Sequence, residues 1–507
     1  MNEELLERLT ESVEKEEFEE SVGLLEQLDM KRLTSDQFTV LSGVISAIPE
    51  EKLEASAELC YRMAFLKLVW GDSHGVRKWQ NALLAHRDHL AENTEQRRML
   101  ENRIFCLDIA AHQGQNSNFL MNLAILSHEY GDAVFPLAKL SATRGAPSVL
   151  RGAKDLSVLG KHFRASASIV KPLLGVLLES PKGVCEAAIA EILYEQNDLN
   201  GAMAEAANAI NAEDEEIVFA GLATLARIGA ADATARSPEE ILDHIGALIS
   251  SKKLTWLLPG FEAFRTRFAI LRGDVGAIRE WLEHCGINDL DICIPMNYYR
   301  ILTKAKAYLA LGEHRAAATL LENLHTAMEE DFRPLDTAEC LMDCAIAYEA
   351  LGSTGHALKK LEKALLTVQE FGYVRVFADE GGAAYNLLLK YTAPGNPVNE
   401  SIHRAYLDKI MAAAEAFSRC WPQLYDTAAV SSPTQAEEPP NSDVELTQSE
   451  LQVLKLLGDG YTNNKIAKEI HIELSTVKFH VSNIYRKLGA KGRVEALNLA
   501  RKAGLLP

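Results

Sequence analysis

Two features that define membrane and exported proteins are missing from this sequence of 507 residues. No apolar run approaches the roughly 18 residues that span a bilayer. The N-terminal stretch MNEELLERLTESVEKEEFEE is acidic and amphipathic, with neither the basic start nor the apolar core of a signal peptide. We therefore expect a cytoplasmic protein with no membrane partner.

The sequence also lacks the motifs of the common cofactor and metal sites. Its eight cysteines are scattered without a C-x-x-C pair, which argues against a zinc site or a disulfide framework. No glycine-rich G-x-x-x-x-G-K-[ST] loop for nucleotide phosphates occurs. Cys340 and Cys344 are one helical turn apart, and we interpret them as buried apolar thiols, with a redox switch as the alternative. We predict no cofactor, no metal site and no enzymatic activity.

The charge of the chain is unevenly distributed between its C-terminal segment and the rest. The chain has a formal net charge of −19, yet residues 444–507 contain ten Lys or Arg and six Asp or Glu and so carry +4. The rest of the chain therefore carries −23. An acidic body repels DNA, whereas a basic segment attracts it. This asymmetry predicts that the C-terminal segment is the nucleic-acid surface.

Residues 1 to about 422 show helical periodicity almost throughout, interrupted by short polar turns. The clearest repeat pairs Ala307–Gly312 (AYLALG) with Ala347–Gly352 (AYEALG), offset by 40 residues. Weaker copies of the same helix–turn–helix unit occur at residues 65–72, 190–202 and 268–277. Such pairs stack into a tetratricopeptide-like superhelix with an extended concave surface.

The predicted fold class is therefore all-α. We assign residues 1–422 to a tetratricopeptide-like helical-repeat region for sensing or interaction, with a last helix from about residue 398 to Cys420. Residues 423–443 are rich in Pro, Ser and acidic side chains and are predicted to form a flexible linker. Residues 444–507 form the predicted C-terminal domain.

The C-terminal domain begins with the signals of a short helix. Thr447 and Glu450 have the spacing of a capping box. Leucines recur at helical spacing from Leu451 to Leu457, before Gly458. Two further short helices follow, separated by a tight turn at residues 471–474.

The third of these helices has one apolar and one basic face. Val477, Val481 and Ile484 share the apolar stripe. The opposite face carries Lys478, Phe479, Ser482, Asn483 and Arg486. Short helices, a tight turn and a basic face are what a helix-turn-helix needs to enter the major groove. The alternative from composition is a small helical bundle with a solvated basic face.

This stretch resembles the LuxR-type DNA-binding domain, a four-helix variant of the helix-turn-helix. The matching residues are Leu446-Thr447, Glu450, Val453-Leu454, Gly460, Asn463, Ile466-Ala467, Thr476-Val477-Lys478, His480-Val481, Ile484, Lys487-Leu488 and Arg493-Val494. The resemblance implies that Lys478, Phe479 and Ser482 face base edges of double-stranded DNA. The remaining predicted DNA-binding residues, several of them near phosphates, are Thr462, Asn463, Lys465, Thr476, His480, Asn483 and Arg486.

The resemblance also implies a homodimer that forms through a fourth helix, at about residues 493–503. The expected dimer residues are Val494, Leu497, Ala500 and Arg501.

Two positions depart from the family pattern or stand out on the predicted DNA face. The family usually has an acidic residue where Lys465 stands, and a lysine at a helix N-terminus opposes the helix dipole. We hypothesise that a phosphate contact compensates for it. Phe479 points an apolar ring outward, where a thymine methyl is a plausible partner. The alternative is an exposed aromatic side chain with no role.

The helical repeats resemble the sensor region of MalT-like LuxR regulators over about residues 185–390. The resemblance rests on the repeats at residues 298–365, on Ala190–Leu199 and on the run Phe371–Gly381 (FGYVRVFADEG). It implies that a small-molecule inducer or a regulatory protein binds the superhelix. The family normally begins with an ATP-binding module, which we expect this chain to lack.

The predicted function is that of a bacterial DNA-binding transcriptional regulator. A helix-turn-helix reads the major groove, and the helical repeats sense a ligand or a protein partner. The alternative is a non-enzymatic interaction scaffold that modulates a related full-length regulator.

Overall fold

The computed structural model describes residues 2–111 and 183–425 apart from isolated loop positions, and also residues 143, 146–151, 155, 157 and 160. Towards the C-terminus it describes residues 448–458 and positions 481, 484, 500, 501 and 505. The chain divides into two compact units. One unit contains Met1–Ile287 with Cys293–Ser431, and the other contains Asn288–Ile292 with Ser432–Pro507.

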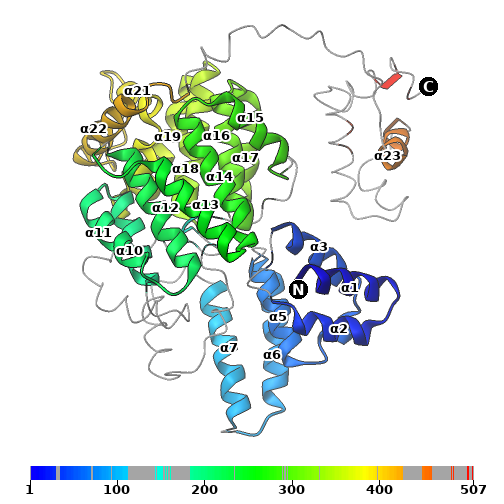
Figure 1. Ribbon diagram of the computed structural model, residues 1–507. Coiled ribbons are helices and arrows are strands. Elements are labelled where there is room, and N and C mark those ends of the chain that lie inside the picture. Colours follow the sequence, from blue (N-terminus) through cyan, green and yellow to red (C-terminus); the bar gives the residue numbers. More distant parts are fainter. Residues whose placement is uncertain are drawn as a thin grey trace. The chain divides into compact units, whose positions relative to one another are not determined.

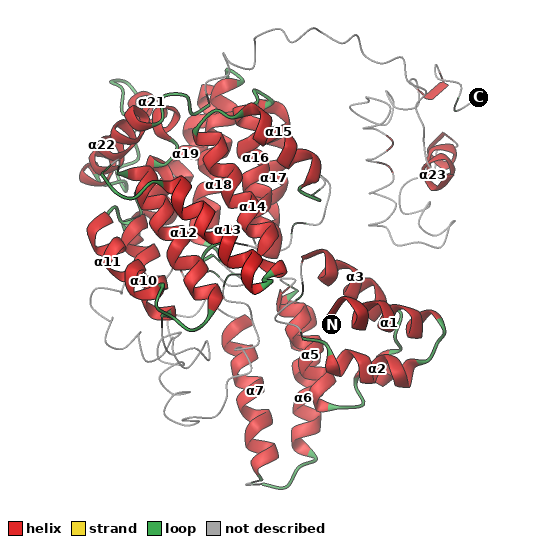
Figure 2. Ribbon diagram, in the orientation of Figure 1, coloured by secondary structure: helices red, strands yellow, loops and turns green. Residues whose placement is uncertain are grey.

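Every regular element of the described residues is a helix, as Figure 2 shows, and the predicted all-α fold is confirmed. The N-terminal helices are α1 (Asn2–Glu14), α2 (Phe18–Gln27), α3 (Ser35–Ser46), α4 (Glu50–Leu53), α5 (Ala57–Val69), α6 (Ser73–Asp88) and α7 (Glu95–Ala111). None of the described helices is long and apolar enough to cross a bilayer.

The region that follows holds a longer series of helices (Figure 1). It contains α10 (Val184–Glu195), α11 (Leu199–Ala209), α12 (Glu215–Ala231), α13 (Pro238–Lys252), η4 (Thr255–Leu257), α14 (Leu258–Leu271), α15 (Val275–His284), η5 (Pro295–Asn297), α16 (Tyr298–Ala310) and α17 (His314–Met328). It continues with α18 (Pro334–Ala350), α19 (Thr354–Val368), η6 (Gln369–Phe371), α20 (Arg375–Ala378), α21 (Gly381–Tyr391) and α22 (Arg404–Cys420).

The predicted 40-residue repeat is confirmed by two turns of the same geometry. The turns join α16 to α17 and α18 to α19, and each has a left-handed glycine, with φ +77° at Gly312 and +76° at Gly352. In both turns the next N–H donates to the carbonyl five residues back, at 2.8 Å from Glu313 and 2.9 Å from Ser353. This bond caps a helix C-terminus and sends the chain back beside the helix it has left.

The weaker sequence copies contain the same turn. Asn197 and Gly273 are left-handed, with φ +64° and +65°. The residues after them, Asp198 and Asp274, donate their N–H groups five residues back at 2.8 and 2.9 Å. Each aspartate then caps the following helix, because its carboxylate accepts an N–H of the first turn at 3.1 Å. Local sequence alone therefore specifies most of the helix pairs.

Stacking of these pairs places the first helix of one pair beside the first helix of the next. Figure 1 shows α14, α16 and α18 side by side, and α14 packs on α16 and α16 on α18. Small residues such as Ala307 and Ala347, both fully buried, allow the helices to approach closely. Cys340 and Cys344 of α18 are buried free thiols, as the sequence predicted, and the Cys340 thiol donates to the carbonyl of Leu321 in α17.

One predicted boundary is wrong. Helix α22 begins at Arg404 rather than near residue 398. Asn399 explains the delay, because its side chain accepts the N–H of Ser401 at 3.0 Å and its carbonyl accepts the N–H of Ile402 at 3.0 Å. An asparagine that bonds its neighbours' backbone in this way favours a turn over a helix.

In the C-terminal unit the described residues agree with the predicted helical pattern. Helix α23 (Gln448–Gly458) begins directly after Thr447 and ends at the predicted glycine. It buries Val453, Leu454 and Leu457. Val481 and Ile484, on the predicted apolar stripe, are helical and have exposed fractions of 7% and 0%.

The repeat turns generate a first prediction, with a matched control in the adjacent helix. A methyl group at Gly352 meets no atom within 4 Å, so Gly352→Ala introduces only the strain of a left-handed alanine. We expect a loss of about 1–2 kcal/mol in the free energy of unfolding. Gly355 is helical and equally open. Gly355→Ala should therefore raise stability by about 0.5–1 kcal/mol.

Urea denaturation of both variants beside the wild type measures the two changes. If both variants gained stability or both lost it, the left-handed conformation of Gly352 would not explain the effect of its substitution.

Candidate functional site

The predicted DNA-binding residues lie outside the described residues, as do two of the predicted dimer residues. They are Thr462, Asn463, Lys465, Thr476, Lys478, Phe479, His480, Ser482, Asn483, Arg486, Val494 and Leu497. Ala500 and Arg501 are described and helical. Ala500 is fully buried and Arg501 is exposed.

The described residues of the helical repeats contain a cavity of about 110 Å³. Its wall comes from helices α10, α12, α14, α16, α18, α20 and α22 and from residues 147–151. Aromatic rings, aliphatic side chains and a dense set of charged groups line it. Cavities with an apolar surface and a few convergent polar groups are the usual sites of small ligands.

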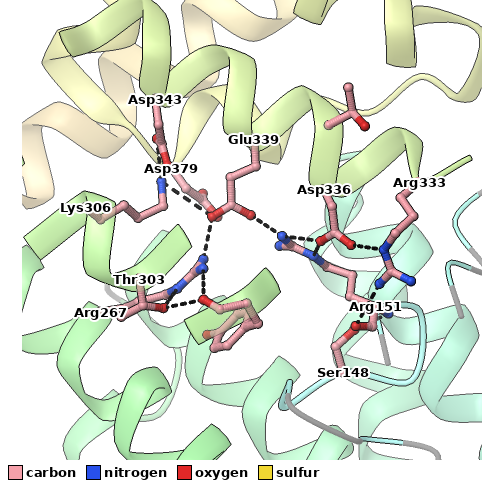
Figure 3. A network of polar contacts seen from close by, with 12 residues as sticks. Ser148, Arg151, Arg267, Thr303, Lys306, Arg333, Asp336, Glu339, Asp343 and Asp379 are labelled. Carbon is pink, nitrogen blue, oxygen red and sulfur yellow. Dashed lines mark hydrogen bonds and ion pairs between the residues drawn. The ribbon is translucent and has the colours of Figure 1, made fainter. Parts of the chain in front are cut away.

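Glu339 of α18 is at the centre of the charged groups (Figure 3). One carboxylate oxygen pairs with Arg267 of α14 at 2.7 Å and with Lys306 of α16 at 3.5 Å. The other pairs with Arg151, which also donates to Asp336 at 2.7 Å. Glu339 thus joins α18 to two neighbouring helices and to a segment far away in the sequence.

Lys306 extends this network towards α20. Its ammonium group lies 2.7 Å from Asp343 and 2.5 Å from Glu380, and all three side chains are buried. Glu380 follows α20 in the chain. A second arm runs through Arg333, which donates to Asp336 at 2.7 Å (Figure 3).

A further group of polar side chains lies at the α10 side of the cavity. The Tyr194 hydroxyl donates to Asp379 at 2.8 Å. Arg227 pairs with Glu195 at 2.5 Å, and its guanidinium lies 4.0 Å from the centre of the Tyr194 ring. Arg375 pairs with Asp379 and lies 5.4 Å from the same ring centre. Stacked guanidinium groups keep their charge while covering the apolar faces of the rings.

Helical spacing explains why the charges of α18 converge. Asp336, Glu339 and Asp343 are separated by three and four residues, which places them on one face of the helix. On α16, Thr303 and Lys306 have the same spacing and face Arg267, whose Nε donates to the Thr303 hydroxyl at 2.8 Å.

Burial and ion pairing shift the pKa values of Glu339 and Asp343 in opposite directions. Burial alone would raise the pKa of Glu339, but Arg151, Arg267 and Lys306 outweigh it and hold that pKa well below its usual range. Burial raises the pKa of Asp343 well above its usual range, and the negative charges of Glu380 and Glu339 add to this effect against the opposing charge of Lys306. The network therefore contains one firmly ionised carboxylate and one carboxyl group that favours a proton.

Sequence reasoning did not assign any of these side chains to a site. The run Phe371–Gly381 stood out by resemblance, and it supplies Arg375, Asp379 and Glu380 to the cavity wall. Charged residues at inward-facing positions of the helices, such as Lys306 and Glu339, are a second sequence feature that could have predicted a polar site in the interior.

Substitution of Glu339 tests whether the network holds the helices together. Glu339→Gln leaves three buried cations short of a partner, so we expect a loss of about 3–5 kcal/mol in the free energy of unfolding at pH 7. Because the pKa of Glu339 is lowered on folding, its contribution is present above the unfolded-state pKa and disappears as the pH falls through the folded-state pKa. The difference from the wild type should therefore shrink below about pH 4.5.

Glu240→Gln is the matched control, since Glu240 pairs with Arg236 on an exposed surface at 3.1 Å. That change should cost less than about 1 kcal/mol. Equal losses for the two variants in denaturant titrations at several pH values would contradict a structural role for Glu339.

Two family comparisons match separate parts of the chain. Residues 180–393 match the family described as MalT-like TPR region, and this range contains all the helices that line the cavity except α22. Residues 444–500 match the family described as bacterial regulatory proteins, luxR family.

Curated relatives match slightly less than half of this chain. The protein named HTH-type transcriptional regulator MalT from Vibrio cholerae serotype O1 is 29% identical over 227 residues, which cover 44% of this chain and 25% of the relative. The protein of the same name from Vibrio campbellii is 28% identical over 228 residues, covering 45% of this chain and 25% of the relative. The matched part thus spans a quarter of the length of these relatives. The chain joins a MalT-like tetratricopeptide region to a DNA-binding domain of the LuxR family.

Proposed function

We propose that this chain is a sequence-specific transcriptional regulator whose helical repeats sense a small ligand. The observation that carries the DNA-binding part is the LuxR-family match over residues 444–500, within a segment whose net charge is +4. Lys478, Phe479 and Ser482 are the proposed base-reading residues. A homodimer formed through the fourth helix would present two such domains to two half-sites and bind them with higher affinity through effective concentration.

Lys478→Ala tests this reading, with two control substitutions. If Lys478 contacts a base edge, its loss should cost about 1–3 kcal/mol of binding free energy at a selected site and relax specificity at one position. Arg486→Ala should instead weaken selected and scrambled DNA alike and lower the slope of the salt dependence by about one, as for a phosphate contact. Lys455→Ala removes the same charge from α23, where no contact is predicted, and should have little effect.

The measurement is selection from a pooled oligonucleotide library followed by titration of the full chain at two salt concentrations. Wild-type binding by Lys478→Ala to both selected and scrambled DNA would refute the base contact. If the full chain selected no sequence at all, the interaction scaffold would replace the regulator as the proposed function.

The cavity supports the sensing part of the proposal. Most of its lining residues belong to the MalT-like TPR region, and it combines aromatic rings with cationic groups. Arg375 has an exposed fraction of 3%, yet its Nε donates to no acceptor among the described residues. A buried donor without a partner is costly unless a ligand supplies one. We therefore propose a compact ligand with a carboxylate or phosphoryl oxygen that accepts this hydrogen bond.

A thermal-shift screen tests the ligand class. Small carboxylates and phosphorylated metabolites are compared with neutral polyols on the wild-type chain and on Arg375→Gln. A ligand at about one hundred times its dissociation constant stabilises the folded state by about 2.7 kcal/mol, which raises the melting temperature. We expect acidic compounds to shift the wild type and to lose this effect with Arg375→Gln. Hits confined to neutral polyols would contradict the ligand class.

A further inference from the structure

The residues after the last helix of the repeats form part of the cavity wall. Trp421–Tyr425, which we call the C-terminal strap, follow α22 directly and precede most of the predicted linker. Leu424 and Tyr425 line the cavity, although both belong to the segment that the sequence assigned to the linker. The wall of the proposed ligand site is thus continuous in sequence with the connection to the DNA-binding domain.

Side-chain hydrogen bonds and apolar packing hold the strap in place. The Trp421 indole donates to the carbonyl of Ala230, near the end of α12, at 2.8 Å. Leu424 packs against buried apolar residues of α14 and α16. The Tyr425 hydroxyl donates to one oxygen of Glu380 at 2.6 Å, while Lys306 binds the other oxygen. The strap therefore connects directly to the charged network of the cavity.

The backbone at the end of the strap is held against its conformational preference. Tyr425 has a φ of +60°, in the left-handed region that non-glycine residues rarely adopt. Such a conformation persists only where surrounding contacts impose it, and it relaxes when they are lost. Loss of the contacts to Glu380 and to the apolar residues would remove what keeps Tyr425 in place.

The size of the cavity indicates which part of its wall moves. At about 110 Å³ the cavity is smaller than the roughly 300–1,000 Å³ of typical ligand pockets. Most of the wall consists of helices locked to one another by buried ion pairs. The strap lies beyond the end of α22 and contains no charged residue that could lock it by an ion pair, so a ligand larger than the cavity enters at lowest cost by displacing it.

We propose that the C-terminal strap closes the cavity and that a ligand in the cavity displaces Leu424 and Tyr425, which frees the start of the linker. Occupancy of the repeats is then transmitted to the DNA-binding domain through the chain itself. This mechanism rests on the proposed function for its output, but the closure and the displacement are properties of the helical repeats alone.

The first experiment measures hydrogen exchange of the backbone amides of Trp421, Gln423, Leu424 and Tyr425 in the full chain, since Pro422 has no amide hydrogen. Tyr425→Phe removes only the hydroxyl that bonds Glu380, and a lost hydrogen bond to a charged group should speed exchange in the strap about tenfold. Tyr348→Phe is the matched control, because Tyr348 donates to Glu322 at 2.9 Å and neither residue lines the cavity. Equal strap exchange in the two variants would overturn the closure.

The second experiment uses anilinonaphthalene sulfonate, an acidic aromatic molecule that matches the charges and rings of the wall. Saturation of the wild-type chain with this probe should speed exchange in the strap, as displacement requires. Tyr425→Ala should bind the probe about tenfold more tightly than Tyr348→Phe does. Without the Tyr425 ring the cavity is already open, so probe binding no longer includes the free energy of displacing the strap. Probe binding with unchanged strap exchange, or no probe binding by Tyr425→Ala, would overturn the displacement.

Both experiments use the chain without DNA. Their outcome therefore stands apart from that of the oligonucleotide selection. A chain that selects no DNA sequence can still show the closure, and a chain that reads DNA can still lack it.

Discussion

Glu339 places a carboxylate in the interior of the helical repeats, where an unpaired charge would cost several kcal/mol. Three cations meet it there, from α14, from α16 and from the segment near residue 151. Buried ion pairs add little net stability compared with apolar packing, but they tolerate only the arrangement that satisfies them. The rest of the structure depends on this constraint, because the positions of α14, α16 and α18 relative to one another decide which side chains surround the cavity.

The same charges explain how the cavity can respond to a ligand. Lys306 is shared between Glu339, Asp343 and Glu380, and Glu380 in turn accepts the Tyr425 hydroxyl. A ligand group that binds one of these side chains weakens or strengthens the hydrogen bonds of the others, since the members of a buried polar network polarise one another. In the proposed mechanism, the end of the repeats thereby responds to what occupies their interior.

The acidic residues 1–443 and the basic C-terminal domain, which we call the body and the tip, have different proposed roles. Repulsion of DNA by the body favours contact through the tip alone, and this preference weakens as salt screens the charges. The proposed regulator therefore needs no large interface between its two units, because a short segment at the end of the repeats can carry the coupling.

The sequence by itself determined the helices, the repeat and the identity of the C-terminal domain. Glycine at positions 312 and 352, aspartate caps at positions 198 and 274, and apolar stripes act within a few residues of one another, so local patterns predict them. The same reasoning misplaced the start of α22, because Asn399 favours a local turn. Only the tertiary structure decided the cavity, since Arg151 and Asp336 are 185 residues apart and meet only when the pairs stack. The position of Tyr425 against Glu380 is a second such case: the composition of residues 423–443 predicts a flexible segment, and packing against the finished repeats holds its first residues in place.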